Sequence, residues 1–135
     1  MPVVHEERLR VAWVDTDASG RIHYTAALRY FEVAEHGLMR DLLDGLSGPG
    51  PNQPFSLPRV HVEADYKLAL RYADEFTCRA RVAHVGASSV TYRFEIADAA
   101  GQLAIEGRIV AVATDLEGRK TPLPDALRKA LESAL

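Results

Sequence analysis

The stretch that decides the fold is DTDASGRIHYTAALRYFEVAEHGLMRDLL, residues 15–43. Two carboxylates one residue apart, Asp15 and Asp17, lead into Ser-Gly, and a helical pattern begins at Tyr24. From there apolar side chains recur every three or four residues, which predicts a long helix with one apolar stripe. The members of this stripe are Leu28, Phe31, Ala34, Leu38, Leu42 and Leu43.

A strand is predicted immediately before this stretch. The segment RLRVAWV at 8–14 alternates between apolar and polar residues, which is typical of a half-buried strand. Leu9, Val11 and Trp13 share the face that is predicted to be buried.

A loop and four strands are predicted after the helix. Gly45 and Gly48 are expected to end the helix, and the proline- and glycine-rich stretch 45–58 is expected to form a loop. Four apolar segments then follow with short turns between them, so we expect consecutive strands to pair as antiparallel meanders. These segments are RVHVEADYKL at 59–68, EFTCRARVAHV at 75–85, SVTYRFEIA at 89–97 and LAIEGRIVAVAT at 103–114. A short terminal helix is predicted to begin with Asp125 as its N-cap.

The order of these elements predicts an α+β fold. An antiparallel sheet with one long helix must carry that helix on one sheet face, because both apolar surfaces are then buried. By length, residues 1–135 are expected to form a single domain. The other sheet face and the sheet edges remain available to a second copy of the chain, so we expect a homo-oligomer.

Composition excludes several classes of function. Charged residues make up 26% of the chain and the net charge is −3, which predicts neither nucleic-acid binding nor membrane binding. Cys78 is the single cysteine, so neither an intrachain disulfide nor a thiolate zinc site is expected, and the histidines lack metal-ligand spacing. The N-terminal residues lack the apolar region of a signal peptide, and no apolar run is long enough to cross a membrane. We therefore expect a cytoplasmic protein that needs no metal.

Two interpretations of the acidic pair are open. In the first, Asp17 or Ser19 caps the helix, which is the ordinary role of such residues before a helix. In the second, the helix amides stay free to polarise a substrate carbonyl, and a neighbouring carboxylate attacks it or activates water. Gly20 would then allow the backbone to approach the substrate closely. Spacing alone does not separate these interpretations.

The segment RVAWVDTDASGRIHYTAALRYFEVAE resembles the signature of the 4-hydroxybenzoyl-CoA thioesterase family. Later segments, VHVEADYKLALRYADEF, RVAHVGASSVTYRFEI and PLPDALRKAL, resemble this family in the same order, so the similarity covers nearly the whole chain. The resemblance implies a hot-dog fold, in which a five-stranded antiparallel sheet wraps around a long central helix. It also implies dimers or tetramers that bind acyl-CoA at subunit interfaces, with no cofactor.

The resemblance assigns roles to individual positions. Asp17 matches the catalytic carboxylate of the family, which acts as a nucleophile or as a general base. Tyr24 matches the residue whose backbone N–H faces the thioester oxygen. Asp15 is expected to be structural, as a hydrogen-bonding partner for the loop, and Gly20 and His23 are expected to lie beside the substrate.

The chain departs from the family pattern at two places. Where many members have Tyr-His-x-Asn-Tyr, this chain has HYTAA, so that Tyr24 fills the histidine position and Ala26 the asparagine position. The turn GASS at 86–89 lacks the basic cluster with which a relative binds nucleotide phosphates. We therefore expect other cations to bind the CoA phosphates, and the candidates are Arg59, Lys67 and Arg71.

Three functional hypotheses follow. The first is hydrolysis of an acyl-CoA or acyl-carrier-protein thioester by Asp17, with the Tyr24 amide as oxyanion donor. The second is an acyl-CoA-binding or sensor protein without turnover, which the missing asparagine favours and the retained Asp17 opposes. The third is a hot-dog dehydratase, which would need a catalytic histidine motif that the sequence does not display.

Overall fold

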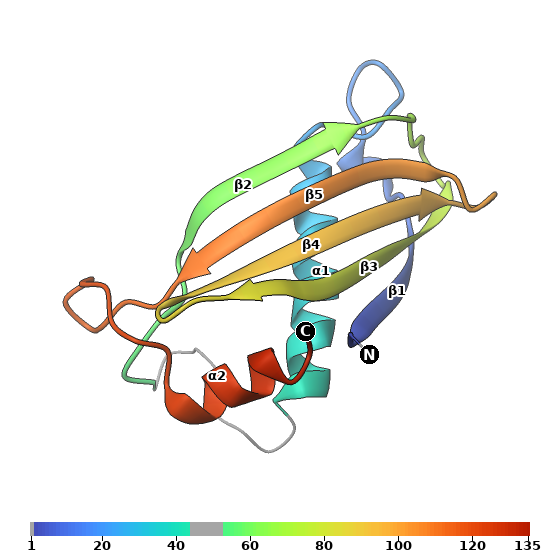
Figure 1. The fold of residues 1–135 in the computed structure, drawn as a ribbon. Coiled ribbons are helices and arrows are strands. Elements are labelled where there is room, and N and C mark those ends of the chain that lie inside the picture. Colours follow the sequence, from blue (N-terminus) through green and yellow to red (C-terminus); the bar gives the residue numbers. More distant parts are fainter. Residues whose placement is uncertain (1, 44–52) are drawn as a thin grey trace.

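The fold consists of one antiparallel sheet, a long helix and a short C-terminal helix (Figure 1). The structure is a computed structural model, and it describes residues 2–43 and 53–135. Its elements in chain order are β1 (Val4–Arg10), the 3₁₀ helix η1 (Trp13–Asp15), α1 (Ala26–Leu42), β2 (Arg59–Tyr66), β3 (Glu75–Val85), β4 (Ser89–Asp98), β5 (Leu103–Val112) and α2 (Asp125–Glu132).

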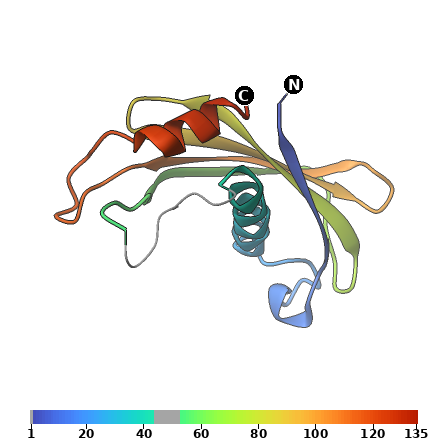
Figure 2. The same cartoon turned by 90° about the horizontal axis from the view of Figure 1, so that it is seen from below.

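The sheet has five strands in the order β1-β3-β4-β5-β2, and every neighbouring pair is antiparallel. The predicted meander is confirmed for β3, β4 and β5, but the predicted pairing of β2 with β3 was wrong, because β2 pairs with β5 and forms one edge of the sheet while β1 pairs with β3 and forms the other. Figure 2 looks nearly along α1 and shows the sheet curving around one side of this helix. The expected hot-dog architecture, a sheet wrapped around one long helix, is therefore confirmed.

Small residues on the inner sheet face let α1 approach closely. Phe31 of α1 lies flat against Phe94 of β4, with ring centroids 4.7 Å apart and an interplanar angle of 13°. Gly107 of β5 lies under the same Phe31 ring, and a Cβ atom there would overlap that ring and crowd the carbonyl oxygen of Glu63. The Phe31 ring thus fills the space that Gly107 leaves on β5, as close packing requires.

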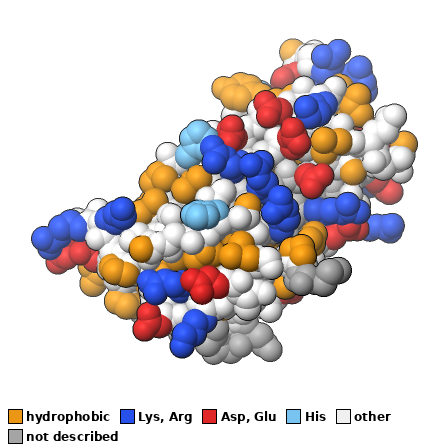
Figure 3. All heavy atoms as spheres, viewed as in Figure 1, with side chains coloured by type: hydrophobic (Ala, Val, Ile, Leu, Met, Phe, Trp, Pro, Cys, Tyr) orange, Lys and Arg blue, Asp and Glu red, His pale blue; other side chains and the backbone are white. Residues whose placement is uncertain are grey.

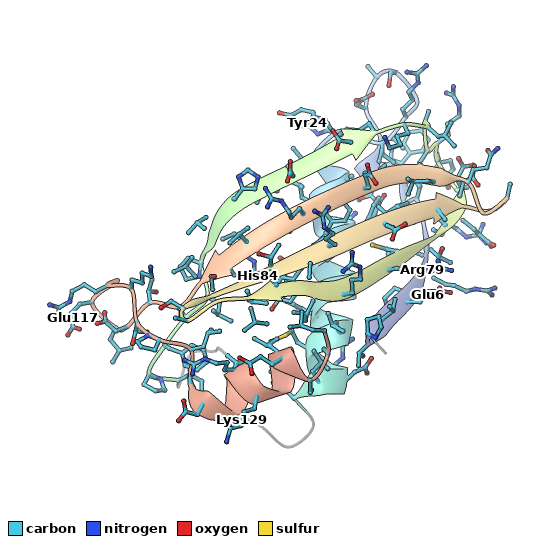
Figure 4. All side chains as sticks on the ribbon, viewed as in Figure 1. Glu6, Tyr24, Arg79, His84, Glu117 and Lys129 are labelled. Atoms are coloured by element: carbon cyan, nitrogen blue, oxygen red, sulfur yellow. The ribbon has the colours of Figure 1, made fainter. Side chains whose placement is uncertain are left out.

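The outer sheet face carries interspersed charges, which Figure 3 shows over the strands. Arg79 of β3 pairs with Glu6 of β1 at 2.7 Å, and Figure 4 shows these two side chains beside one another. Arg108 of β5 pairs with Glu63 of β2. Alternation along the strands therefore separates an apolar inner face from a charged outer face.

The first strand lies earlier in the chain than predicted. β1 ends at Arg10, whose register partner is Glu75, the first residue of β3. Beyond this point the sheet offers no partner strand, and the chain turns into η1 instead of continuing to Val14. Trp13 is consequently 75% exposed, so its predicted place on a buried strand face was wrong.

The helix boundaries also differ from the prediction. α1 begins at Ala26 instead of Tyr24, and it ends at Leu42. Gly45 and Gly48 lie outside the described residues. The N-cap position of α2 is Pro124, and Asp125 is the first residue of the helix, so the predicted Asp125 cap was wrong. Leu127 and Leu131 are buried as the apolar stripe of α2 predicts.

The helix and the edge strand β2 leave apolar side chains exposed. Val60 and Val62 are 61% and 43% exposed, and Leu28 of the predicted helix stripe is 36% exposed. Among the described residues, no helix combines the length and the apolar character that a membrane span needs.

Candidate active site

Asp17 lies in a tight hairpin between η1 and α1. Thr16 and Ile22 form an antiparallel bridge, and the Asp17 N–H donates to the Arg21 carbonyl at 3.0 Å. Gly20 closes the turn with φ of +79°, a conformation in which glycine avoids the strain of a Cβ atom. Three residues between the paired positions, with glycine in the last place, are typical of a hairpin with a G1 bulge.

The carboxylate of Asp17 is exposed and anchored by one oxygen. Its Oδ1 accepts hydrogen bonds from the Ser19 N–H at 2.8 Å and from the Ser19 hydroxyl at 2.5 Å. These bonds hold the pKa of Asp17 below its ordinary value, and the neighbouring His23 and Arg21 act in the same direction. Oδ2 has no hydrogen-bond partner among the described residues. The carboxylate is thus ionised at neutral pH and presents one free oxygen.

The first interpretation of the acidic pair was wrong, because neither Asp17 nor Ser19 caps α1. The N-cap position is Thr25, with no side-chain cap of its own. Instead the Thr25 N–H donates to Nδ1 of His23 at 3.2 Å, and the Thr25 hydroxyl lies 2.8 Å from the same nitrogen. The His23 imidazole, which the sequence placed beside the substrate, is thus held against Thr25, and among the described residues no side chain caps the first amides of α1.

The turn of Asp17 occurs twice more in the chain. Asp98 and Asp115 each start the same pattern, and Gly101 and Gly118 close it with φ of +83° and +81°. In both turns the aspartate N–H donates to the carbonyl four residues later, at 2.9 Å and 2.7 Å. Aspartate followed three residues later by glycine therefore encodes a hairpin turn wherever it occurs here. Proximity to the start of α1, and not the motif itself, distinguishes Asp17.

Asp15 is buried and fully engaged. It is 5% exposed, it accepts from the Tyr30 hydroxyl at 2.7 Å and from the Ala12 N–H at 3.2 Å, and it pairs with Arg29. A buried carboxylate needs such partners to offset the cost of its desolvation. These contacts join η1 to α1, so the expectation that Asp15 is a hydrogen-bonding partner for the loop is confirmed.

The Tyr24 amide is free at the start of α1. Its N–H has no acceptor among the described residues, whereas the neighbouring amides of His23 and Thr25 are both hydrogen-bonded. The Tyr24 carbonyl accepts from the hydroxyl of Tyr66, at the end of β2. Figure 4 shows Tyr24 beside that end of the strand. Tyr66, which the sequence did not single out, thus fixes the peptide that follows the free N–H.

Two hollows flank this region. One of about 340 Å³ lies at the start of α1 and is lined by Val14, Asp15, Thr16, His23, Thr25, Ala26 and Arg29. The other, of about 250 Å³, is lined by Arg21, Ile22, Tyr66, Lys67, Leu68, Ala69 and Leu70. Neither lining includes Asp17 or Tyr24, and both residues are exposed in the single chain.

The structure separates Arg59 from Lys67, so the three predicted phosphate-binding residues do not form one cluster. Arg59 pairs with the buried Glu35 and donates to the Leu57 carbonyl at 2.9 Å. It lies at the opposite end of β2 from Lys67, about 25 Å away at about 3.3 Å per residue. Arg71, in contrast, lies next to Arg21 in an antiparallel bridge, close to the Asp17 turn. Arg21 was not singled out in the sequence, because its neighbour is fifty positions away in the chain.

An exposed aromatic pair borders the site. Trp13 of η1 meets Tyr72 edge to face, with ring centroids 5.4 Å apart. Val14 beside it is 84% exposed.

Cys78 is buried, and burial raises the pKa of its thiol to about 12, so it is no candidate nucleophile. The described residues contain no group of three or more metal-ligating side chains placed to hold an ion.

The chain belongs to the thioesterase-like superfamily, because the model of this family matches residues 11–131. No curated protein sequence matches the chain. Solved structures with the same fold include a putative thioesterase from Prochlorococcus marinus, with a TM-score of 0.85 and 21% identity over 97% of this chain and 96% of that one.

Two further structures extend the comparison. A 1,4-dihydroxy-2-naphthoyl-CoA thioesterase from Synechocystis has a TM-score of 0.82 and 22% identity over 96% of each chain. A DHNA-CoA thioesterase from Staphylococcus aureus has a TM-score of 0.86 and 18% identity over 96% of this chain and 89% of that one. At these identities the likeness establishes the hot-dog fold.

Proposed function

We propose that this protein hydrolyses an acyl-CoA thioester, with Asp17 as nucleophile or general base and the Tyr24 amide as oxyanion donor. The observation that carries the proposal is the free Tyr24 N–H at the start of α1, next to a turn that presents an ionised carboxylate with one free oxygen. Membership of the thioesterase-like superfamily supports the same reaction.

The chemistry follows from these two groups. In one route Asp17 Oδ2 attacks the thioester carbon, and water then hydrolyses the resulting anhydride; in the other, Asp17 takes a proton from the water that attacks. Both routes break the C–S bond and release a carboxylic acid and the CoA thiol. In both, negative charge develops on the carbonyl oxygen, where the Tyr24 N–H and the positive end of α1 stabilise it.

The oligomer and the substrate class are part of the proposal. Asp17 and Tyr24 lie on open surface, and the apolar side chains of Leu28, Tyr66 and Leu68 are exposed nearby, so a second subunit would enclose the site. We propose a dimer or tetramer of the 4-hydroxybenzoyl-CoA thioesterase type. Two solved structures of the same fold carry names of thioesterases for an aromatic acyl-CoA, so aromatic esters deserve the first assays.

The test is release of free CoA from aromatic, short-chain and long-chain acyl-CoA esters by the wild type and by Asp17→Asn. Because asparagine can form the same turn, we expect an intact fold and a loss of kcat of about a hundredfold or more. Asp98→Asn and Asp115→Asn are matched controls, because both aspartates start the same turn away from α1.

Two outcomes contradict the proposal. Equal rates for the wild type and Asp17→Asn would remove Asp17 from the mechanism. Tight binding of acyl-CoA esters without turnover by the wild type would favour the acyl-CoA-binding alternative.

A further inference from the structure

Two arginines lie directly opposite one another beside the candidate active site. Arg21, at the end of the Asp17 turn, forms an isolated antiparallel bridge with Arg71, and the adjacent Ile22 N–H donates to the Leu70 carbonyl at 2.9 Å. Side chains at opposed positions of an antiparallel pair lie about 5 Å apart at Cβ, where like charges destabilise the pairing. Both arginines are exposed.

Within the described part of the chain no salt bridge relieves this repulsion, although Arg21 lies near enough to Asp17 to help lower the pKa of that carboxyl. Neither guanidinium has a carboxylate oxygen within 4.0 Å among residues 2–43 and 53–135. Asp74 does lie near Arg71, but its carboxylate accepts from the Arg71 backbone N–H at 2.9 Å. The two guanidinium groups are therefore free to share an anion.

A hollow with a third cation adjoins this pair. Arg21 and Lys67 both line the hollow of about 250 Å³, and Leu68, Ala69 and Leu70 form its apolar part. The Lys67 ammonium group is 3.6 Å from Glu106, and both side chains are nearly half exposed, so a stronger anion can compete for it. Tyr66 lines the same hollow and donates to the Tyr24 carbonyl, so Tyr66 connects the hollow to the residue that carries the free N–H.

We propose that Arg21 and Arg71, with Lys67, bind the phosphate groups of coenzyme A. The inference rests on the proposed function in naming CoA as the ligand, but the arginine pair itself is a feature of the fold. Two adjacent planar guanidinium groups can each donate in bidentate fashion to phosphate oxygens, and a bound phosphate would neutralise their mutual repulsion. Arg59 has no part in this site, since it pairs with Glu35 at the other end of β2.

Calorimetric titration with CoA and with pantetheine tests this site. Pantetheine carries the thiol arm without the phosphates, so only CoA should respond to the arginines. We expect Arg21→Ala and Arg71→Ala each to weaken CoA binding about tenfold, the double variant to weaken it further, and pantetheine binding to stay unchanged. The matched control is Arg119→Ala, because Arg119 occupies the place of Arg21 in the Asp115 turn.

The outcomes separate this inference from the proposed function. Unchanged CoA binding in the double variant, or equal weakening for CoA and pantetheine, would overturn the inference. If the wild type hydrolyses no ester while CoA binding still depends on both arginines, the phosphate site stands and the thioesterase proposal fails. Thermal unfolding midpoints check the fold, and removal of one of two like charges is expected to leave the midpoint unchanged or raise it.

Discussion

The Ser19 hydroxyl distinguishes the Asp17 turn from the Asp98 and Asp115 turns, which have the same backbone shape. In the other turns, Oδ1 of Asp98 accepts from the amides of Ala100 and Gln102, and Oδ1 of Asp115 accepts from residues at the same offsets. In the Asp17 turn the Ser19 hydroxyl donates to Oδ1, and the Arg21 N–H is instead directed to Ser19 Oγ at 3.3 Å. The hydroxyl thus adds a hydrogen bond to the same carboxylate oxygen that the backbone amides bind in all three turns.

At this scale we predict the effect of Ser19→Ala on the pH dependence of kcat/KM. Hydrogen bonds from Ser19 lower the pKa of Asp17, so their partial loss raises that pKa toward its ordinary value. The ionised carboxylate is the active form, and the acidic limb of the profile should therefore move to higher pH. Ser19→Thr keeps the hydroxyl and should restore the limb. A uniform fall in rate at every pH would show a merely structural role.

His5 of β1 connects this strand to α1 through hydrogen bonds to two carboxylates, a contact that we call the His5 clamp. Its Nε2 lies 2.8 Å from Glu7 Oε1 on the same strand, and its Nδ1 lies 2.7 Å from Asp41 Oδ2 on α1. Ionised carboxylates only accept hydrogen bonds, so both ring nitrogens must donate and the imidazole is protonated. Gly37 of α1 gives the ring its space, because a Cβ atom there would overlap the ring. Arg40 is the other charged group nearby, 4.0 Å from Glu7.

This clamp predicts a pH-dependent contribution to stability. Burial lowers the pKa of His5, but the hydrogen bonds to Glu7 and Asp41 outweigh burial and leave the pKa above the ordinary value of 6.5. A raised folded-state pKa means that the stabilisation is fully present below about pH 6.5 and is lost as the pH rises through the folded-state pKa. The free energy of unfolding of His5→Gln should therefore fall below that of the wild type in acid and approach it in alkali. A difference independent of pH would contradict the protonated clamp.

The sequence predicted the interior strands and the helix well, for a physical reason. In β3 and β4, the alternation of apolar and polar residues indicates which strand face packs against α1, and this pattern lies within each strand itself. The end of β1 is different: Trp13 continues the alternation, but the strand stops where its partner β3 begins at Glu75. An element boundary that depends on a distant partner strand is invisible to a local pattern.

In the candidate site, too, the sequence predicted the residues of a local motif and missed those whose role depends on a distant neighbour. Asp17 and Tyr24 were named because they lie in one continuous motif. Tyr66 and Arg21 were missed, because each acquires its role from a neighbour far along the chain, the Tyr24 carbonyl and Arg71. The motif itself did not distinguish a turn from a catalytic loop, since the same turn forms at Asp98 and Asp115.

At the scale of the whole molecule, β2 is an edge strand with exposed apolar side chains. Such an edge invites pairing with another chain. We predict that two copies associate through this region and that Val62→Glu lowers the sedimentation coefficient by dissociating them, because the association would bury the new charge. Leu116→Glu is the control, since Leu116 is 80% exposed in a turn after β5. Identical sedimentation of the wild type and Val62→Glu would exclude this edge as the interface.

Trp13 gives the molecule a built-in optical probe. It is the only tryptophan of the chain, it lies 75% exposed on η1, and it touches Tyr72 edge to face. Its fluorescence therefore arises from one place, two residues before the buried Asp15 and four before Asp17. Anything that covers this corner, a CoA ester or a second subunit, removes water from the indole and shifts its emission to shorter wavelength. Occupancy of the corner can thus be followed without any label.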